Sequence, residues 1–182
     1  MQAGKVVRAF PAKGKSKIVL RTPRWEDLDD FLELINSLVE ERADILRSEK
    51  VSREEEIDFM ARVLSHLEKD EMFYLVAEVD GKVVAVSELS RRSGYESHVG
   101  VIGIAIRNGY RDLGIGTELM KTLEMQARRM GLKVLTLTAF ATNKPAIHVY
   151  QKVGFVQTGT IPKKHFKGGK YVDELIMTKL LE

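Results

Sequence analysis

Residues Ile104 to Thr117 read IAIRNGYRDLGIGT, and this stretch decides the fold. An uncharged strand comes first, a glycine-containing turn follows, and a helix begins near Thr117. The first turn of a helix leaves backbone N–H groups without an intrahelical partner, so it attracts an anion. Gly114 and Gly116 lack a Cβ, which lets a phosphate approach the backbone closely, and Arg111 can add a charge-assisted hydrogen bond. The stretch therefore predicts a phosphate-binding turn between a buried strand and a helix.

Two other phosphate-binding loops do not fit this stretch. A P-loop requires Lys and then Ser or Thr after its last glycine, whereas Gly116 is followed by Thr117 and Glu118. A dinucleotide-binding fingerprint requires a third glycine at position 119, which is Leu119. A structural alternative stays open, in which Gly114 and Gly116 only allow tight packing between helix and strand.

The segments before this stretch alternate between strand and helix patterns. Ser52 and Glu55 form a capping-box pattern that opens a helix. We expect its buried stripe to consist of Ile57, Met60, Leu64 and Leu67. Asp80-Gly81 is typical of a hairpin turn. The predicted elements are a strand at 17–21, helices at about 22–39 and 52–67, and strands at 73–79, 82–89 and 98–106. The polar residues 40–51 could cover a substrate.

The segments after it continue the alternation. A helix is predicted from about residue 117 to 130, and Gly131 stands where a left-handed residue commonly ends a helix. A strand at 133–139, a short helix at 145–153 and strands at 155–160 and 171–180 follow. The order of elements indicates an α/β protein.

Composition excludes several classes of function. The chain has 182 residues and a net charge of +3 from 29 basic and 26 acidic residues, too even to indicate a nucleic-acid partner. No apolar run approaches the ~20 residues that span a bilayer, and the charged N-terminus does not resemble a signal peptide. We therefore expect a cytoplasmic protein without a membrane partner. The absence of cysteine excludes disulfides, thiolate metal sites and a cysteine nucleophile, and we expect no metal.

Two segments carry a resemblance to a known family. Arg111 to Gly116 resembles the Arg/Gln-x-x-Gly-x-Gly/Ala motif of the GCN5-related N-acetyltransferase superfamily. Asn143 to Phe155, NKPAIHVYQKVGF, is similar to the superfamily's Asn-x-x-Ala-x-x-x-Tyr-x-x-x-Gly-Phe segment. Asp112 and Leu113 depart from the usual run, where small or basic residues are more common.

The resemblance covers about residues 17–181 and implies the architecture. We expect a single α/β (α+β) domain over residues 17–182, with a mixed central sheet of about six to seven strands flanked by about four helices. Residues 1–16 precede it as an extra strand or a loose tail.

The resemblance also implies an N-acetyltransferase with acetyl-CoA as donor. The pantetheine arm would pair, like an extra strand, with Ile104, Ala105 and Ile106. The pyrophosphate would lie on the amides of Arg111, Asp112, Leu113, Gly114, Ile115, Gly116 and Thr117. Asn143 would bind the cofactor arm or orient the following helix, and its position before Pro145 also suits an ordinary helix N-cap.

The same resemblance implies catalytic roles. Tyr150 would donate a proton to the departing thiolate, although its spacing from Ile147 and Val153 also suits a core aromatic. The carbonyl oxygen gains charge during the reaction and needs a donor, for which a backbone N–H near Ile104–Ile106 is the candidate. The general base could be Glu88, His98 or a chain of waters, and either side chain could instead be structural or simply exposed.

The acceptor follows from a resemblance near the C-terminus. Phe166 to Leu181 resembles a branch of the superfamily that acetylates amino acids, polyamines and similar small amines. Tyr171 or Asp173 could face this acceptor or could serve sheet packing and a turn, and Glu88 or Asp173 could anchor its ammonium group. We therefore prefer a small-molecule amine, attacked directly in a ternary complex because no cysteine can carry the acetyl group. The alternatives are a protein N-terminus or lysine and a non-catalytic acetyl-CoA-binding module. The C-terminal strands could also pair two subunits into a homodimer.

Overall fold

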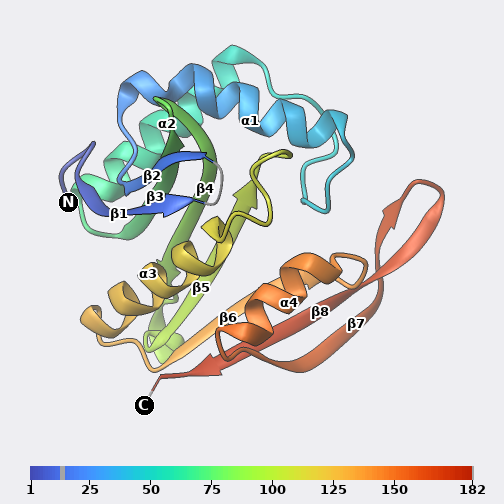
Figure 1. The fold of residues 1–182 in the computed structure, drawn as a ribbon. Helices are drawn as coiled ribbons and strands as arrows, with labels where there is room; N and C mark the ends of the chain where they lie inside the picture. Colours follow the sequence, from blue (N-terminus) through green and yellow to red (C-terminus); the bar gives the residue numbers. More distant parts are fainter. Residues whose placement is uncertain (13–14, 182) are drawn as a thin grey trace.

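The computed structural model describes residues 1–12 and 15–181, which form one mixed eight-stranded sheet with four α-helices and two short 3-10 helices (Figure 1). The strands are β1 (Val6–Ala12), β2 (Lys15–Arg21), β3 (Met72–Val79), β4 (Lys82–Arg91), β5 (Val99–Ile106), β6 (Val134–Phe140), β7 (Val156–Lys167) and β8 (Lys170–Leu180). The helices are η1 (Trp25–Asp27), α1 (Leu28–Glu40), α2 (Arg53–Glu68), η2 (Gly94–Glu96), α3 (Ile115–Arg129) and α4 (Lys144–Lys152). The sheet exceeds the expected six or seven strands because the N-terminal residues form β1, which pairs with β2.

The strand order is β1-β2-β3-β4-β5-β6-β8-β7, and only β5 and β6 are parallel neighbours in the described chain. β5 therefore lies near the middle of the sheet, as its uncharged sequence predicts. Its parallel pairing with β6 joins Val99–Val101 to Val134–Thr136 and goes no further. Beyond Val101 the two strands diverge (Figure 1), while β5 stays paired with β4 as far as Ile106.

Helices cover both faces of the sheet. α1 and α2 pack in one hydrophobic cluster, and α3 and α4 pack in another. Successive residues of a strand point to opposite faces, so β3 contributes Tyr74 and Val76 to the first cluster and Leu75 and Ala77 to the second. In β4 the alternation is interrupted at the register shift with β3, where Val84 and Ala85 both join the second cluster.

The start of α2 confirms the predicted capping box, but its buried face differs from the prediction. Ser52 Oγ accepts a hydrogen bond of 3.2 Å from the Glu55 N–H, and the Glu55 carboxylate accepts one of 2.8 Å from the Ser52 N–H. The expectation that Ile57 is buried was wrong, because its side chain is 36% exposed. A period of 3.6 residues fits two adjacent stripes, and packing against β3 selects the one formed by Met60, Val63 and Leu67.

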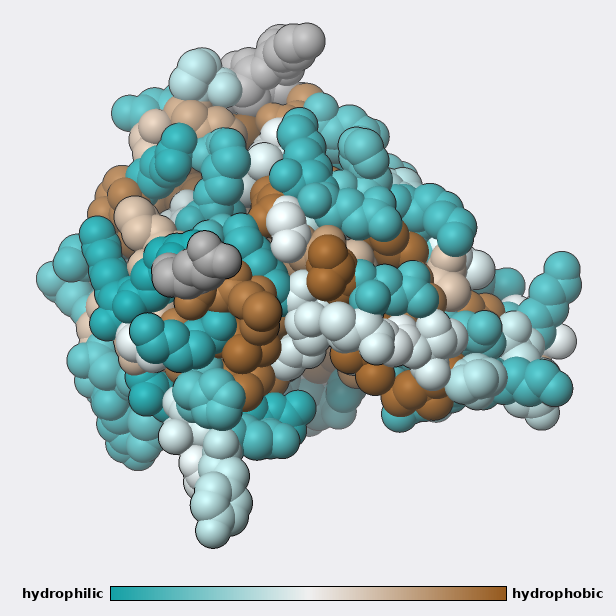
Figure 2. All heavy atoms as spheres, turned by 90° about the horizontal axis from the view of Figure 1, so that it is seen from below, coloured by the Kyte–Doolittle hydropathy of each residue, from teal (hydrophilic) through white to brown (hydrophobic). Residues whose placement is uncertain are grey.

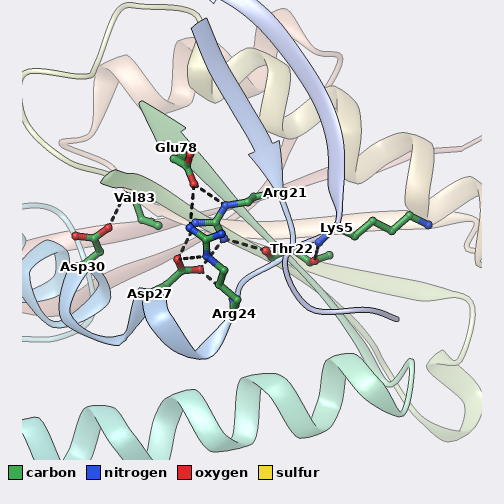
Figure 3. Close-up of polar contacts among 8 residues, drawn as sticks. All are labelled: Lys5, Arg21, Thr22, Arg24, Asp27, Asp30, Glu78 and Val83. Carbon is green, nitrogen blue, oxygen red and sulfur yellow. Dashed lines mark hydrogen bonds and ion pairs between the residues drawn. The ribbon is translucent and has the colours of Figure 1, made fainter. Parts of the chain in front are cut away.

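Arg21 is a buried cation at the end of β2, and acceptors surround its guanidinium (Figure 3). It donates two hydrogen bonds of 2.7 Å to Asp27, one of 2.7 Å to Glu78 and one of 3.1 Å to the Thr22 carbonyl. Burial alone would lower the pKa of Arg21, but the hydrogen bonds to Asp27 and Glu78 outweigh burial and raise it. The cluster joins β2 and β3 to the residue that precedes α1.

The surface seen from below mixes apolar patches with polar side chains (Figure 2). The exposed apolar residues of β7 and β8 are Val156, Ile161, Phe166, Tyr171 and Leu180. β7 is an edge strand, so its outer side is open to another strand. Pairing of two subunits through β7 and β8 stays a prediction. In the part of the chain that the structure describes, none of the helices is long and apolar enough to cross a membrane.

Candidate active site

The free edge of β5 is the centre of the candidate site. From Ile102 to Ile106, β5 pairs with β4 on one side, and none of the described strands pairs with its other edge. Backbone N–H and C=O groups of a strand point alternately to its two sides. Ile104 to Ile106 therefore present backbone donors and acceptors to an extended ligand, which could bind as an added strand.

The turn after β5 uses backbone conformations that glycine adopts readily. Gly109 and Gly114 have φ angles of +84° and +83°, in the left-handed region that glycine adopts readily. Gly114 is the N-cap of α3, which begins at Ile115 rather than near Thr117. The first-turn N–H groups of α3 have no partner within the helix, so they are available to an anion, and binding of the pyrophosphate there stays a prediction.

The two glycines at the start of α3 have different roles. A Cβ on Gly114 would meet nothing within 4 Å, so the left-handed backbone is what requires glycine there. A Cβ on Gly116 would lie 3.3 Å from Cδ1 of Ile106 and 3.7 Å from Cγ1 of Val149. Tight packing, the alternative left open by the sequence, thus applies to Gly116 alone.

Arg111 lies between the turn and the segment after α1. Its Nε donates a 3.2 Å hydrogen bond to the carbonyl of Ile106, at the free edge of β5. Its guanidinium also pairs with Glu41. Arg111 therefore makes two protein contacts at the place where sequence reasoning expected a phosphate contact.

The segment after α1 reaches across to the other diverging strand. Asp44 forms an ion pair with Lys167 of β7 and accepts a 3.1 Å hydrogen bond from Thr142, just after β6. Through Glu41 and Asp44, the segment therefore contacts both sides of the space between β5 and β6. The sequence indicated a covering segment at residues 40–51, but nothing local in it pointed to these two acidic residues as its contacts.

Tyr150 on α4 combines burial with a hydroxyl that none of the described residues hydrogen-bonds. Its side chain is 7% exposed, and its ring lies 6.4 Å from the ring of Phe155. Burial raises the pKa of Tyr150 to about 12. The phenol is therefore protonated at neutral pH, while its ring belongs to the hydrophobic core.

Asn143 caps α4. Its side-chain oxygen accepts a 3.3 Å hydrogen bond from the N–H of Ala146. This confirms the helix N-cap alternative and orients the helix that carries Tyr150. A contact between Asn143 and the cofactor arm stays a prediction.

Glu88 is a carboxylate at the middle of the sheet. On β4 it lies opposite Gly103 of β5 and Tyr74 of β3. A Cβ on Gly103 would come within 3.1 Å of Oε1 of Glu88, so this glycine leaves room for the carboxylate. None of the described residues hydrogen-bonds or ion-pairs with it, and burial raises the pKa of Glu88. Burial and the nearby Glu88 also raise the pKa of Tyr74 to about 12.

His98 is not brought to this site. It is an exposed residue in the turn before β5, and its carbonyl accepts hydrogen bonds from Lys133 and Val134. It lies six positions before Ile104, a span of about 20 Å along a strand. The structure thus gives no support to His98 as the base.

Tyr171 and Asp173 lie on the β7–β8 hairpin and have structural contacts. Tyr171 is 66% exposed, and its ring lies 5.1 Å from that of Phe166. The Asp173 carboxylate accepts a 2.8 Å hydrogen bond from the N–H of Lys163, whose φ is +53°. Asp173 therefore stabilises an irregular turn of β7, and an acceptor contact stays a prediction for both residues.

Sequence reasoning missed Glu174. This buried carboxylate lies 3.1 Å from Nε2 of His165, whose ring stacks on Phe140 at a centroid distance of 4.0 Å. The pairing depends on the shifted register between β7 and β8, for which the sequence contains no local signal.

Comparisons with known proteins agree with this geometry. Residues 32–155 match the model of the acetyltransferase (GNAT) family. The chain is 36% identical over 112 residues to the L-amino acid N-acetyltransferase AaaT of Escherichia coli, covering 58% of this chain and 67% of that protein. It is 32% identical over 102 residues to an N-alpha-acetyltransferase of Sulfurisphaera tokodaii, covering 50% and 61%. A GNAT-family acetyltransferase structure from Streptococcus pneumoniae superposes with a TM-score of 0.79 at 25% identity, covering 91% and 99%.

Proposed function

The chain belongs to the acetyltransferase (GNAT) family and is an acetyl-CoA-dependent N-acetyltransferase, and we propose that it acetylates the primary amine of a small molecule. The observation that carries the proposal is the free edge of β5, which leads directly into the glycine turn at the start of α3. An extended arm with a phosphate group at one end fits these two features in that order. The pantetheine arm pairs with Ile104 to Ile106, and the pyrophosphate binds the amides of residues 111–117.

The departing thiolate receives its proton from Tyr150. A phenol with a pKa of about 12 stays protonated at neutral pH, which suits a donor and excludes a resting base. Its hydroxyl has no hydrogen-bond partner among the described residues, so a ligand atom is a suitable partner for it. The N-cap formed by Asn143 and the packing against Phe155 hold the phenol in place.

Glu88 is the base or the ammonium anchor. Its raised pKa makes its carboxylate a better proton acceptor than an ordinary glutamate, and its position beside β5 places it along the proposed acetyl-binding strand. In the proposed reaction the amine nitrogen attacks the thioester carbonyl and loses its proton to Glu88. The N–C bond forms, the C–S bond breaks, and the thiolate takes a proton from Tyr150.

A cavity beside the sheet suggests the size of the acceptor. It has a volume of about 370 Å³ and lies between α1, α2 and the sheet, where Val86 and Ala105 line it. Glu88 lies two residues beyond Val86 on the same face of β4. Arg47, Arg62 and Glu56 also line the cavity, so it offers both signs of charge to a zwitterionic or amine-bearing metabolite. Its volume lies within the range of small-molecule pockets.

Two alternatives differ in acceptor and in chemistry. A protein N-terminus or a lysine is the second candidate, which the similarity to an N-alpha-acetyltransferase favours. A non-catalytic acetyl-CoA-binding module is the third candidate. The protonated hydroxyl of Tyr150, which has no partner among the described residues, is evidence against it.

The test is release of free thiol from acetyl-CoA with amino acids, polyamines and peptides that have free N-termini. We expect turnover with one small-molecule class, and acetyl-CoA binding by calorimetry with or without acceptor. Turnover with peptides alone would replace the proposed acceptor by a protein. Absence of turnover with intact acetyl-CoA binding would support the non-catalytic module. A stable acetyl-enzyme formed from acetyl-CoA alone would contradict direct transfer.

A further inference from the structure

The buried face of α2 begins with a carboxylate. Glu56 lies one helical turn before Met60 and two turns before Val63, on the stripe that packs against the sheet. Its side chain is 5% exposed. A glutamate is almost never buried to this extent without a partner. An apolar residue would continue the stripe, so the position of Glu56 calls for a reason other than packing.

Glu56 has no hydrogen bond or ion pair with any of the described residues. Arg47 is close enough for its charge to act on Glu56, but its guanidinium donates a 2.8 Å hydrogen bond to Glu55 instead. Burial is the main influence on Glu56 and raises its pKa, whereas the charge of Arg47 lowers it. A buried carboxylate without a partner destabilises the fold, which is typical of a group kept for binding.

The carboxylate of Glu56 lines the cavity of about 370 Å³ between α1, α2 and the sheet. The other charged residues that line this cavity are exposed, namely Arg47, Glu55, Asp58 and Arg62. Among the described residues, the cavity wall therefore contains one buried charge, and that charge is negative. A ligand that enters the cavity gains most from this group if it carries a cation.

The rest of the wall near Glu56 is apolar and aromatic. Phe31, Leu34 and Ile35 of α1 and Phe59 of α2 line the cavity. The rings of Phe31 and Phe59 lie 6.4 Å apart. Methylene groups pack well against such side chains, and a cation is attracted to the face of an aromatic ring. The wall thus suits a short methylene chain that ends in an ammonium group.

The cavity also reaches the strand at which the acetyl group is proposed to lie. Val86 of β4 and Ala105 of β5, which are paired in the sheet, line it as well. Ala105 belongs to the stretch of β5 proposed to bind the acetyl-CoA arm, and Glu88 lies two residues beyond Val86. A molecule in the cavity therefore has β5 at one side and Glu56 of α2 at another.

We propose that Glu56 binds a second cationic group of the acceptor, remote from the amine that is acetylated. The acceptor is then a diamine or a basic amino acid, and not a monoamine or an amino acid with an apolar side chain. This inference rests on the proposed function and narrows its substrate class. Glu56 determines specificity and takes no part in the chemistry, which uses Glu88 and Tyr150.

The experiment compares acceptors that differ by one terminal amino group: L-lysine with L-norleucine, and 1,5-diaminopentane with pentylamine. Thiol release is measured at saturating acetyl-CoA. We expect kcat/KM of the wild type to be about 10- to 100-fold higher for the member with two amino groups, the range for a hydrogen bond to a charged group. The difference should lie mainly in KM, because the contact is the same in the ground state and the transition state.

Glu56→Gln keeps the shape of the side chain and removes its charge. It should abolish the preference by raising KM for lysine and diaminopentane, and it should leave norleucine and pentylamine unchanged. Glu54→Gln is the matched control, because Glu54 is an exposed acid in the same first turn of α2 and does not line the cavity. The control should retain the full preference. A preference that survives in Glu56→Gln, or an equal loss with all four acceptors, overturns the inference.

Glu56→Met is the second variant and makes the same measurement if Glu56→Gln does not fold. Because it replaces an unpaired buried charge by an apolar side chain, denaturant unfolding should show stability equal to or above that of the wild type. A loss of stability in both variants would show that Glu56 holds the fold, and would overturn the inference. Wild-type turnover without a preference overturns the inference alone. If the wild type turns over none of the four acceptors, the proposed small-molecule acceptor is overturned, and the inference with it.

Discussion

Arg21 on β2 is a buried charge and Glu88 on β4 is a half-buried carboxylate of the same sheet, but only Arg21 has partners among the described residues. Arg21 is 3% exposed, and its guanidinium forms ion pairs with Asp27 and Glu78 (Figure 3). Asp27 is also 3% exposed. Glu88 has no ion pair or hydrogen bond in the described chain, and its pKa is raised by burial. A paired buried charge connects parts of the fold, whereas an unpaired one is held at a cost and remains available for chemistry.

The largest effect should come from breaking the paired charge. Arg21→Met leaves the Asp27 carboxylate buried without its main partner, which should lower the free energy of unfolding by about 3–5 kcal/mol. Denaturant unfolding measures this loss. Arg24→Gln is the matched control, because Arg24 is 46% exposed and 3.5 Å from the same carboxylate. We expect the control to change stability by less than about 0.5 kcal/mol, and equal losses in the two variants would contradict a structural role specific to Arg21.

Removal of the unpaired charge of Glu88 should affect the rate of the reaction and not the binding of acetyl-CoA. Glu88→Gln should lower the turnover number by roughly 10²–10⁴-fold, the usual contribution of a general base, without weakening acetyl-CoA binding. Steady-state kinetics and calorimetry separate the two quantities. Glu26→Gln, which removes an exposed carboxylate from η1, should leave both unchanged. Full activity in Glu88→Gln would mean that this half-buried carboxylate has no chemical role.

Tyr150→Phe tests the other unpartnered polar group of the site. Phenylalanine retains the ring beside Phe155 but removes the proton donor, so turnover should fall about 10²-fold, at the low end of acid–base contributions. Acetyl-CoA affinity should change much less. If affinity falls as far as turnover, Tyr150 is a packing residue.

Titration of Glu88 should change the reaction rate clearly with pH, and it should change the stability of the fold by the smallest amount among these predictions. Because burial raises the pKa of Glu88, the acidic limb of the rate profile should lie above about 4.3, the ordinary glutamate value, and should vanish in Glu88→Gln. The native state binds the Glu88 proton more tightly than the unfolded chain, so the neutral carboxyl favours folding at low pH. As pH rises from about 4.3 through the raised pKa, wild type loses this contribution. Glu88→Gln should therefore gain stability relative to wild type only as pH rises, and a gain at acidic pH would contradict the assignment.

Prediction from sequence succeeded where a few neighbouring residues decide the structure. Ser52 and Glu55 form their capping box within one helical turn, and Asp80-Gly81 forms the β3–β4 turn with positive φ angles at both residues. Asn143 likewise caps α4 through a residue three positions away. The buried face of α2 was predicted less well, because Val63 is selected by β3 and not by the period of the helix.

The candidate site divides in the same way. The glycine turn and Tyr150 were singled out from their sequence motifs, and Gly109 and Gly114 of the turn have positive φ angles. His98 was an open alternative because it shares a predicted strand with Ile104. The structure places the two residues near opposite ends of β5, too far apart to act together. Asp44 could not be found from sequence, since its partners Thr142 and Lys167 lie 98 and 123 positions away along the chain.

The sequence by itself determined the order of strands and helices, the turn that starts α3 and the family, because these depend on interactions between residues close in the chain. Tertiary structure decided that β1 joins the sheet, that β5 and β6 diverge after Val101, and that Gly103 makes room for the carboxylate of Glu88. The physical reason is that strand register and burial depend on which distant segments meet. The same meetings of segments decide that Arg21 pairs with Asp27 and Glu78, whereas Glu88 has no partner among the described residues.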